Sequence, residues 1–210
     1  DNYPADSSEQ LEAENNPEDP DSGTRTLTFG RELYTEREDF KEDPPRKYFR
    51  LSPGKEVRLK HAYYITCTDV VKDDTGKISE IHCTYDPATK GGSSEDGRKI
   101  KGTLHWVTAA EAVDARVCLF DRLFTSENVE EQENFLDHLN ADSLTILDHC
   151  KLEPALKDSI TGDRMQFLRQ GYYSRDTENT GDGRPVFNRI VGLRDSWAKI
   201  ERQTGGKTKA

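Results

Sequence analysis

The sequence is poor in the apolar residues from which protein cores are built. Hydrophobic residues make up only 32% of its 210 residues, and the mean hydropathy is −0.92. A chain of this length forms one large domain or two small ones, and so little apolar material leaves part of it in loops or tails. No apolar run approaches the length of a membrane span, and no signal peptide is present. We therefore expect a cytoplasmic protein without membrane contact.

Sequence motifs of catalysis are missing as well. The chain contains no G-x-x-x-x-G-K-[ST] phosphate loop, no G-x-S-x-G nucleophile turn and no H-E-x-x-H zinc motif. Its four cysteines include no C-x-x-C pair and none has zinc-finger spacing with histidine, so we expect buried free thiols in a reducing compartment and no metal site. We therefore expect neither catalytic residues nor a cofactor in this chain.

Basic residues are outnumbered, with 30 Lys and Arg against 40 Asp and Glu, which gives a net charge of −10. A balance this acidic argues against a nucleic-acid-binding protein. The acids are unevenly spread, however, because residues 1–24 contain eight of them and no base, and the remainder has a net charge of only −2. Residues 1–23 are also rich in proline, so we expect an acidic linker or loop with little order there. The cations of the remainder are free to cluster.

Polar and apolar residues alternate over residues 57–68, which predicts a half-buried β-strand. Its polar face would carry Arg58, Lys60 and Tyr64. Just upstream, residues 52–54 read Ser-Pro-Gly, which is typical of a turn because Pro fixes φ and Gly accepts positive φ.

The segment before that turn, residues 46–51, alternates too and places Arg46, Tyr48 and Arg50 on one face. The two stretches would form a hairpin with cations and aromatic rings on neighbouring strands. This combination suits an anionic partner with flat rings, such as unpaired RNA. The alternative is a solvated strand face with ordinary surface cations.

Short strands and turns recur along the rest of the chain. The turn at residues 73–76 separates two strands that we expect to pair antiparallel, and Trp106 is expected to be a buried anchor. A capping-box spacing and an imperfect apolar face predict one helix, over residues 128–139. Other predicted strands cover residues 100–107, 115–124, 143–150, 164–173 and 185–191.

Many short strands, frequent turns and little helix indicate an all-β fold made of two small β-barrels with short helices. We place the first barrel at residues 24–103 and the second at residues 104–200, with strands that could be shared between them. Residues 201–210 form a polar tail.

A second polar cluster lies in RMQFLRQGYY, residues 164–173. Met165 and Phe167 share one face of the predicted strand and Gln166 points to the other, whereas Arg169 breaks the alternation and indicates a bulge or a strand end. A Gln amide offers a donor beside an acceptor, which complements the Watson–Crick edge of uracil. The Arg fork suits phosphate or the O6/N7 edge of guanine. The alternative here is a solvated strand edge.

Seven stretches, in order, carry a resemblance to a known family. They are GRELYTEREDF (30–40), RLSPGKEVRLKHAYYI (50–65), DGRKIKGTLHWV (96–107), LFDRLF (119–124), LEPALKD (152–158), QFLRQGYY (166–173) and PVFNRIVGLRDSWAKI (185–200). Together they resemble the C-terminal anticodon-binding region of the glutaminyl-tRNA synthetase family. Glutamyl synthetases of the eukaryotic and archaeal type look similar here, but the last stretch favours the glutaminyl family.

The resemblance implies proximal and distal β-barrels that bind a tRNA with a glutamine anticodon, in a monomeric protein that does not bind DNA. It also implies that ATP and magnesium act in a catalytic domain N-terminal to these residues. The chain therefore looks like a piece of a larger ligase, beginning after the first strand of the anticodon-binding region. We expect one barrel to lack that strand.

By position, the resemblance implies specific contacts with the RNA. Arg50 falls where the family contacts the third anticodon base, and Arg58 and Lys60 fall where it contacts the first. Gln166 and Arg169 fall where it contacts the middle uracil and its backbone. These residues, with Lys47, are the RNA-binding residues that we expect.

Lys47 and Phe49 occupy positions that are polar or basic in the family, so Phe49 loses one polar contact to the third base. Base chemistry agrees with the other assignments. Glutamine anticodons begin with C or U, and these two bases share an acceptor that a pure hydrogen-bond donor can bind. The middle base is always U, which needs a donor beside an acceptor. The final base is G, which suits the fork of an Arg side chain. A wrong base would leave such a group unpaired, at about 1–3 kcal/mol each.

Two other functions fit the same residues. One is a stand-alone β-barrel that binds RNA without reading an anticodon, and the other is a protein–protein module with an acidic arm. Anticodon recognition is distinguished from both by a preference for the cognate anticodon.

Overall fold

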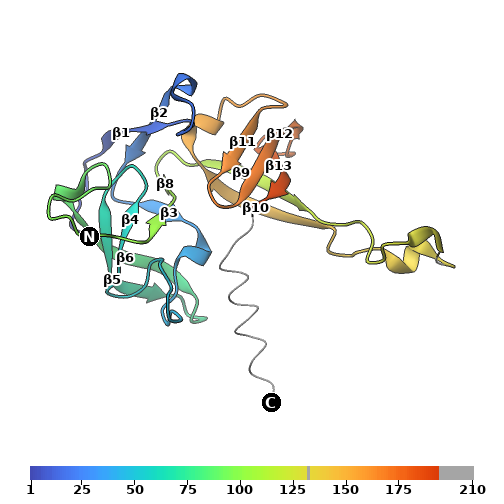
Figure 1. Ribbon diagram of the computed structural model, residues 1–210, viewed down its shortest axis with the longest axis horizontal. Helices are drawn as coiled ribbons and strands as arrows, with labels where there is room; N and C mark the ends of the chain where they lie inside the picture. The colour runs from blue at the N-terminus through green and yellow to red at the C-terminus, as the bar shows by residue number, and fades with distance from the viewer. Residues whose placement is uncertain (132, 194–210) are drawn as a thin grey trace, which may run out of the picture. The chain divides into compact units, whose positions relative to one another are not determined.

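A computed structural model describes residues 1–131 and 133–193 (Figure 1). The chain divides into two compact units. The first contains residues 1–112 and the short segment 153–155, and the second contains residues 113–152 and the chain from 156 onward. The division lies nine residues beyond the boundary expected at 103/104. The expected tail at 201–210, and residues 194–200 of the expected second barrel, lie outside the described residues.

The first unit is built from short strands that form three sheets. The sheet orders are β1-β2, β3-β8 and β6-β5-β4-β7. The strands are β1 (Glu9–Glu14), β2 (Thr24–Phe29), β3 (Leu33–Thr35), β4 (Glu56–Leu59), β5 (Tyr64–Lys72), β6 (Ile78–Asp86), β7 (Thr103–Leu104) and β8 (Trp106–Thr108). Three 3-10 turns join them, η1 (Pro20–Ser22), η2 (Arg37–Asp39) and η3 (Pro87–Thr89).

The second unit is one five-stranded sheet with the order β10-β9-β13-β12-β11. Its strands are β9 (Val113–Phe120), β10 (Leu144–Leu152), β11 (Arg164–Phe167), β12 (Gly171–Asn179) and β13 (Pro185–Gly192). The remaining 3-10 turns are η4 (Val129–Glu131), η5 (Phe135–His138) and η6 (Pro154–Leu156). Figure 1 shows β9 and β10 running side by side toward a tip that carries η4 and η5. Strands and 3-10 turns are the regular structure of the described residues, which confirms the all-β class.

The core of the first unit forms where the alternating segments meet. Phe29 packs edge-on against Trp106 with ring centroids 5.3 Å apart, and Tyr3 packs on the same Phe29 ring at 5.1 Å. Trp106 is buried, as expected, and its indole N–H donates to the Lys60 carbonyl at 2.8 Å. The predicted pairing across the turn at 73–76 is confirmed by the antiparallel β5–β6 pair. The smaller core of the second unit centres on Phe187, which packs against Phe167.

The expectation that residues 1–23 form a linker with little order is wrong for the middle of that segment. Strand β1 pairs antiparallel with β2, with Leu11 opposite Leu27. Leu11 and Ala13 are buried while the acidic residues between and beside them face solvent, with Glu12 and Glu14 exposed. Two apolar residues at a spacing of two, here Leu11 and Ala13, are enough to add a strand when a partner strand offers its edge.

The strand predicted over residues 57–68 is in fact two strands joined by a tight turn. Strands β4 and β5 pair antiparallel, and the turn between them is closed by the Leu59 N–H donating to the Tyr63 carbonyl at 2.8 Å. His61 takes a left-handed conformation at φ +64 to make that turn. Residues 46–51 form no strand, so the hairpin partner expected there is wrong as well.

The helix predicted over residues 128–139 is also wrong. The described residues there form only η4 and η5. Asn128 Nδ2 donates to the Glu131 carboxylate at 3.5 Å, which is a bond between side chains and not the side chain-to-backbone bonding of a capping box. Phe135, Leu136 and Leu139 are exposed, so no packed face stabilises a longer helix.

All four cysteines are free thiols, as expected. Cys67 and Cys118 are buried, and Cys83 lies directly opposite Cys67 on the β5–β6 pair. Burial, followed by the neighbouring Cys67, raises the pKa of the Cys83 thiol to about 12. Both effects keep this thiol protonated and unreactive.

Glu153 joins the first unit through an ion pair with Arg25 and a hydrogen bond with His105. Its carboxylate accepts hydrogen bonds from Arg25, at 2.5 and 3.1 Å, and lies 2.9 Å from His105 Nε2. The Glu153 side chain is only 14% exposed. Burial alone would raise the pKa of Glu153, but the bonds from His105 and Arg25 outweigh it and lower the pKa from the usual 4.5 to about 2.

Glu153 is expected to stabilise this unit above about pH 4.5 and to lose that contribution as the pH falls toward 2. Glu153→Gln is expected to lower the free energy of unfolding by about 2–3 kcal/mol at pH 7, because it leaves Arg25 and His105 without a charged partner. Urea unfolding of both proteins at pH 7 and pH 3 measures this, with the exposed Glu12→Gln as control. If the original protein and Glu153→Gln lost equal free energy of unfolding between pH 7 and pH 3, the stabilising role assigned to the Glu153 carboxylate would be contradicted.

Candidate nucleic-acid interface

The side chains expected to bind RNA fall into two sets, one in each unit. The first unit carries Lys47, Arg50, Arg58 and Lys60, and the second carries Gln166 and Arg169. Each set has its own surroundings, which determine what it can recognise.

Gly102 brings the first set together from separate parts of the chain. Its carbonyl accepts the backbone N–H of Arg58 at 2.9 Å. On its other side the Phe49 carbonyl approaches so closely that a Cβ built on Gly102 would lie 2.2 Å from that oxygen. The segment containing Phe49 and Arg50 therefore lies against Gly102, just before strand β7, and β7 pairs with the strand β4 that carries Arg58.

Arg50 is half-buried and held by an acidic neighbour. Its Nε lies 3.4 Å from Asp39 Oδ1, and an Nη donates to the Glu38 carbonyl at 3.2 Å. Asp39 is itself buried, at 1% exposed. A buried carboxylate fixes the direction of a guanidinium more firmly than an exposed one does, so Arg50 is presented in a set orientation.

The Arg58 side chain extends from the outer face of β4, because its neighbours Val57 and Leu59 point into the core and are buried. Its guanidinium lies 5.5 Å from the centroid of the Tyr64 ring, and Nη2 donates to the Tyr64 hydroxyl at 3.3 Å. The predicted grouping of Arg58 with Tyr64 is therefore confirmed, although they face each other across a hairpin and not along one strand. Arg58 Nε is buried and has no hydrogen-bond partner among the described residues.

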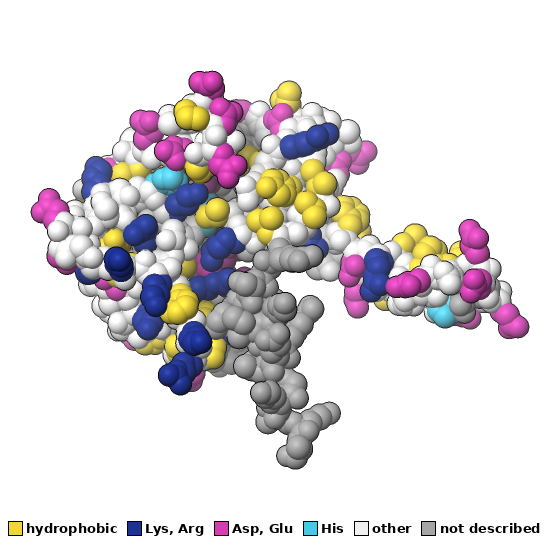
Figure 2. Space-filling model, viewed as in Figure 1, with side chains coloured by type: hydrophobic (Ala, Val, Ile, Leu, Met, Phe, Trp, Pro, Cys, Tyr) yellow, Lys and Arg dark blue, Asp and Glu magenta, His cyan; other side chains and the backbone are white. Residues whose placement is uncertain are grey.

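Aromatic and basic side chains are exposed next to these arginines. Phe49 is 48% exposed, and Lys101 Nζ lies 4.9 Å from the centroid of its ring. Lys47 is exposed at a left-handed position with φ +72, and Lys60 is half-buried in the β4–β5 turn. Figure 2 shows Lys and Arg side chains gathered on the visible face of this unit. An exposed ring among cations can stack on a base while the cations meet phosphates.

In the second unit, Gln166 lies exposed on the outer face of β11. Its neighbours Met165 and Phe167 turn inward, where Phe167 stacks on Tyr173 with centroids 4.2 Å apart, so the predicted facing is confirmed. Gln166 is directly opposite Tyr172 on β12, and Tyr172 is 45% exposed. An amide and an aromatic ring thus share one face.

Arg169 lies in the turn that joins β11 to β12, at φ +65. The strand expected over residues 164–173 is therefore a hairpin, and the break in alternation marks the end of β11. Arg169 is half-buried in this turn, three residues after Gln166.

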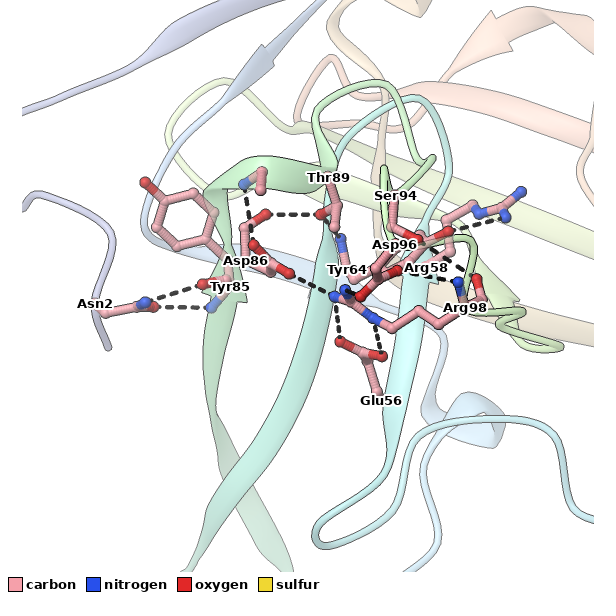
Figure 3. Close-up of polar contacts among 11 residues, drawn as sticks. Asn2, Glu56, Arg58, Tyr64, Tyr85, Asp86, Thr89, Ser94, Asp96 and Arg98 are labelled. Atoms are coloured by element: carbon pink, nitrogen blue, oxygen red, sulfur yellow. Dashed lines mark hydrogen bonds and ion pairs between the residues drawn. The ribbon is translucent and has the colours of Figure 1, made fainter.

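Two cations of the first unit escaped sequence reasoning. Arg98 and Lys101 belong to the DGRKIK stretch, which as a sequence indicates little more than a turn. In the structure Arg98 binds three carboxylates, those of Glu56, Asp86 and Asp96, and lies 5.1 Å from the centroid of the Tyr64 ring (Figure 3). The available signal was the alternation of Lys99 and Lys101 with apolar Ile100, which is weak and does not include Arg98.

Other kinds of site receive no support from the described residues. Across residues 1–131 and 133–193, no three His, Cys, Asp or Glu side chains are grouped so that they could hold a metal ion. The same residues include no helix with the length and apolar character needed to cross a membrane.

Comparisons with known proteins agree with the resemblance seen in the sequence. Two family models described as "tRNA synthetases class I (E and Q), anti-codon binding domain" match residues 1–86 and 103–176. The chain is 55% identical over 199 residues to a protein named glutamine–tRNA ligase from Nitrobacter winogradskyi, covering 95% of this chain and 35% of that protein. Proteins of the same name from Clostridium perfringens and Rhodopirellula baltica are each 51% identical, over 93% and 95% of this chain and 36% and 33% of their own lengths. The chain thus spans about a third of the length of these relatives.

Proposed function

Because the chain belongs to the anticodon-binding family of class I tRNA synthetases for glutamate and glutamine, we propose that it reads the anticodon of a glutamine tRNA. It does so in support of ATP-dependent aminoacylation by a glutamine–tRNA ligase. ATP and magnesium act in the catalytic part of that ligase, which has no counterpart among the motifs of this chain. The names of the relatives favour glutamine over glutamate as the amino acid.

One observation carries the proposal. In a chain with a net charge of −10, three stretches that carry cations adjoin Gly102: the one with Phe49 and Arg50, the one with Arg58 and Lys60, and Lys101 next to Gly102 itself. The exposed Phe49 ring lies among them. Phosphates need the cations and unstacked bases need the ring, so the arrangement suits single-stranded RNA better than a folded protein surface.

The resemblance assigns each side chain to a base, and the chemistry of the side chain is compatible with that assignment. Arg58 and Lys60 donate to the acceptor that C and U share at the first anticodon position. Arg50, whose Nε lies 3.4 Å from Asp39, supplies a guanidinium fork that suits a guanine at the third position. Gln166 pairs with the middle uracil, with Tyr172 available for stacking beside it.

Titration of the chain with a glutamine tRNA, and with the same tRNA carrying a changed anticodon, tests the proposal. The cognate tRNA is expected to bind more tightly by at least about fivefold, and Arg58→Ala is expected to weaken binding and to reduce the slope of log K against log salt by about 0.7–0.9, the value for one phosphate contact. Arg116→Ala, which removes a surface ion pair with Asp148 in the second unit, serves as the control.

Each alternative has its own result in this titration. Equal binding of the two tRNAs would indicate an RNA-binding barrel that does not read anticodons. Absence of binding even at low salt would favour a protein–protein module. An unchanged salt slope in Arg58→Ala would count against a phosphate contact by Arg58.

A further inference from the structure

Arg98 in the first unit binds three carboxylates at once. Its Nε and Nη2 bind the two oxygens of Glu56 at 3.0 Å each, Nη2 also binds Asp86, and Nη1 binds Asp96 (Figure 3). Glu56 begins strand β4 and Asp86 ends strand β6, whereas Asp96 lies in the same loop as Arg98. The guanidinium therefore ties the loop at residues 87–102 to two strands of the sheet.

The base of this loop is fixed by a second set of bonds. Thr89, which is fully buried, donates its hydroxyl proton to the Asp86 carbonyl at 2.7 Å and accepts the Tyr64 backbone N–H at 2.8 Å. The Thr89 carbonyl in turn accepts the N–H of Gly92. The path of the loop from Asp86 to Gly92 is thus set by the strand that carries Tyr64.

Held in this way, the loop presses on Arg58. Gly92 has φ +78, and a Cβ built there would lie 2.9 Å from Arg58 Cδ and 3.2 Å from Cγ, so only glycine leaves room for the Arg58 stem. Arg98 and Arg58 lie 5.1 and 5.5 Å from the centroid of the same buried Tyr64 ring. The loop, the ring and strand β4 together enclose Arg58.

Enclosing Arg58 in this way is energetically unfavourable for one of its N–H groups. Arg58 Nε is buried without a hydrogen-bond partner among the described residues, and a buried N–H left unpaired is unfavourable by about 1–3 kcal/mol. A freely moving Arg side chain would escape to water.

We propose that Arg98 is a positioning residue, which clamps the loop at 87–102 against Arg58 and so fixes the direction from which Arg58 meets the first base of the anticodon. The proposal rests on the proposed function, because it assumes that Arg58 contacts that base. Arg98 itself acts through Arg58 and through the loop. Loss of the clamp frees Arg58 to adopt other rotamers, which weakens discrimination between first bases more than it weakens attraction to phosphate.

The test is a double-mutant cycle measured by tRNA binding. Arg58→Ala, Arg98→Gln and the double variant are each titrated with glutamine tRNA, with a version carrying a purine at the first anticodon position, and with a version changed at the middle base. Arg98→Gln is expected to reduce the ratio of the first-base Kd values by at least about fivefold, the lower end for one specific base contact, and to leave the middle-base ratio unchanged. In the Arg58→Ala background it is expected to change binding less than twofold, since the two residues act as one unit.

Two further variants complete the experiment. Arg116→Gln removes an Arg–carboxylate pair of the same kind, 2.7 Å long, from the second unit and is expected to change neither ratio. Arg98→Lys keeps the charge but loses the two-pronged grip on Glu56, so it is expected to reduce the first-base ratio while the chain remains folded by circular dichroism.

Additive effects of Arg58→Ala and Arg98→Gln, or equal loss of the first-base and middle-base ratios, would overturn the positioning role. A first-base ratio that survives both Arg98 variants would do the same. Failure of the proposed function gives a different result, because the unaltered chain would then show no preference for the cognate anticodon at all.

Discussion

Gln166→Ala is expected to abolish the preference of this chain for uracil at the middle anticodon position. The ratio of Kd values between a middle-base variant and the cognate tRNA is expected to fall by about 5- to 150-fold, which corresponds to the 1–3 kcal/mol of one specific base contact. Gln166 is exposed on β11 and packs into no core, so the free energy of unfolding is expected to change by less than about 0.5 kcal/mol. In this variant the discrimination between middle bases is therefore expected to change while the stability of the fold does not.

The matched control is Gln10→Ala, which removes another exposed glutamine, bonded to Thr28 on the β1–β2 pair. It is expected to leave both binding ratios unchanged. Gln166→Glu adds a sharper comparison, since a carboxylate keeps the acceptors, loses the donor and repels phosphate. We expect it to bind cognate tRNA less well than Gln166→Ala does. A Gln166→Ala protein that still distinguishes uracil would place middle-base recognition elsewhere.

Gly102→Ala is expected to destabilise the first unit by about 2–4 kcal/mol, although it adds a single methyl group. That methyl would lie 2.2 Å from the Phe49 carbonyl oxygen and 3.1 Å from the carbonyl carbon, and neither backbone atom can rotate away as a side chain would. Separation of Gly102 from Phe49 would also disturb Arg58, whose N–H binds the Gly102 carbonyl. Affinity for tRNA is therefore expected to fall together with stability.

Urea unfolding and tRNA titration of the same preparation measure both effects. Gly30→Ala is the control, because its added methyl would meet only Thr108 Oγ1, at 3.9 Å, which is an ordinary contact. We expect a change of less than about 1 kcal/mol for that variant. If Gly102→Ala were as stable as Gly30→Ala, the close approach of the Phe49 segment to β7 would be wrong.

The sequence predicted those features that depend on neighbours along the chain. Trp106 was identifiable as a core residue because a large ring in an alternating segment has few other places to go. The β5–β6 pair followed from the Asp-Asp-Thr-Gly turn between two alternating stretches, a local signal for reversal. The inward direction of Phe167 and the outward direction of Gln166 followed from the period of a strand.

Features that depend on distant partners could not be predicted. His61 forms the β4–β5 turn at φ +64 although histidine is no turn signal, and the burial of Val57 and Leu59 on one side and Tyr63 on the other imposes that reversal. The clamp around Arg98 joins carboxylates 42, 12 and 2 residues away, of which only the last is local. The six residues assigned to RNA by resemblance stay predictions until binding is measured.

The segment at residues 153–155 has a consequence for how the protein is made. The first unit takes Glu153 from beyond strand β10, so 40 residues of the second unit, 113–152, emerge from the ribosome before the first unit has its full set of side chains. Until Glu153 has been synthesised, Arg25 and His105 lack the carboxylate that both contact in the folded protein. The first unit therefore cannot complete its contacts before part of the second unit has been translated. An expression fragment that stops at Ala112 would lack Glu153 and would remain without these contacts.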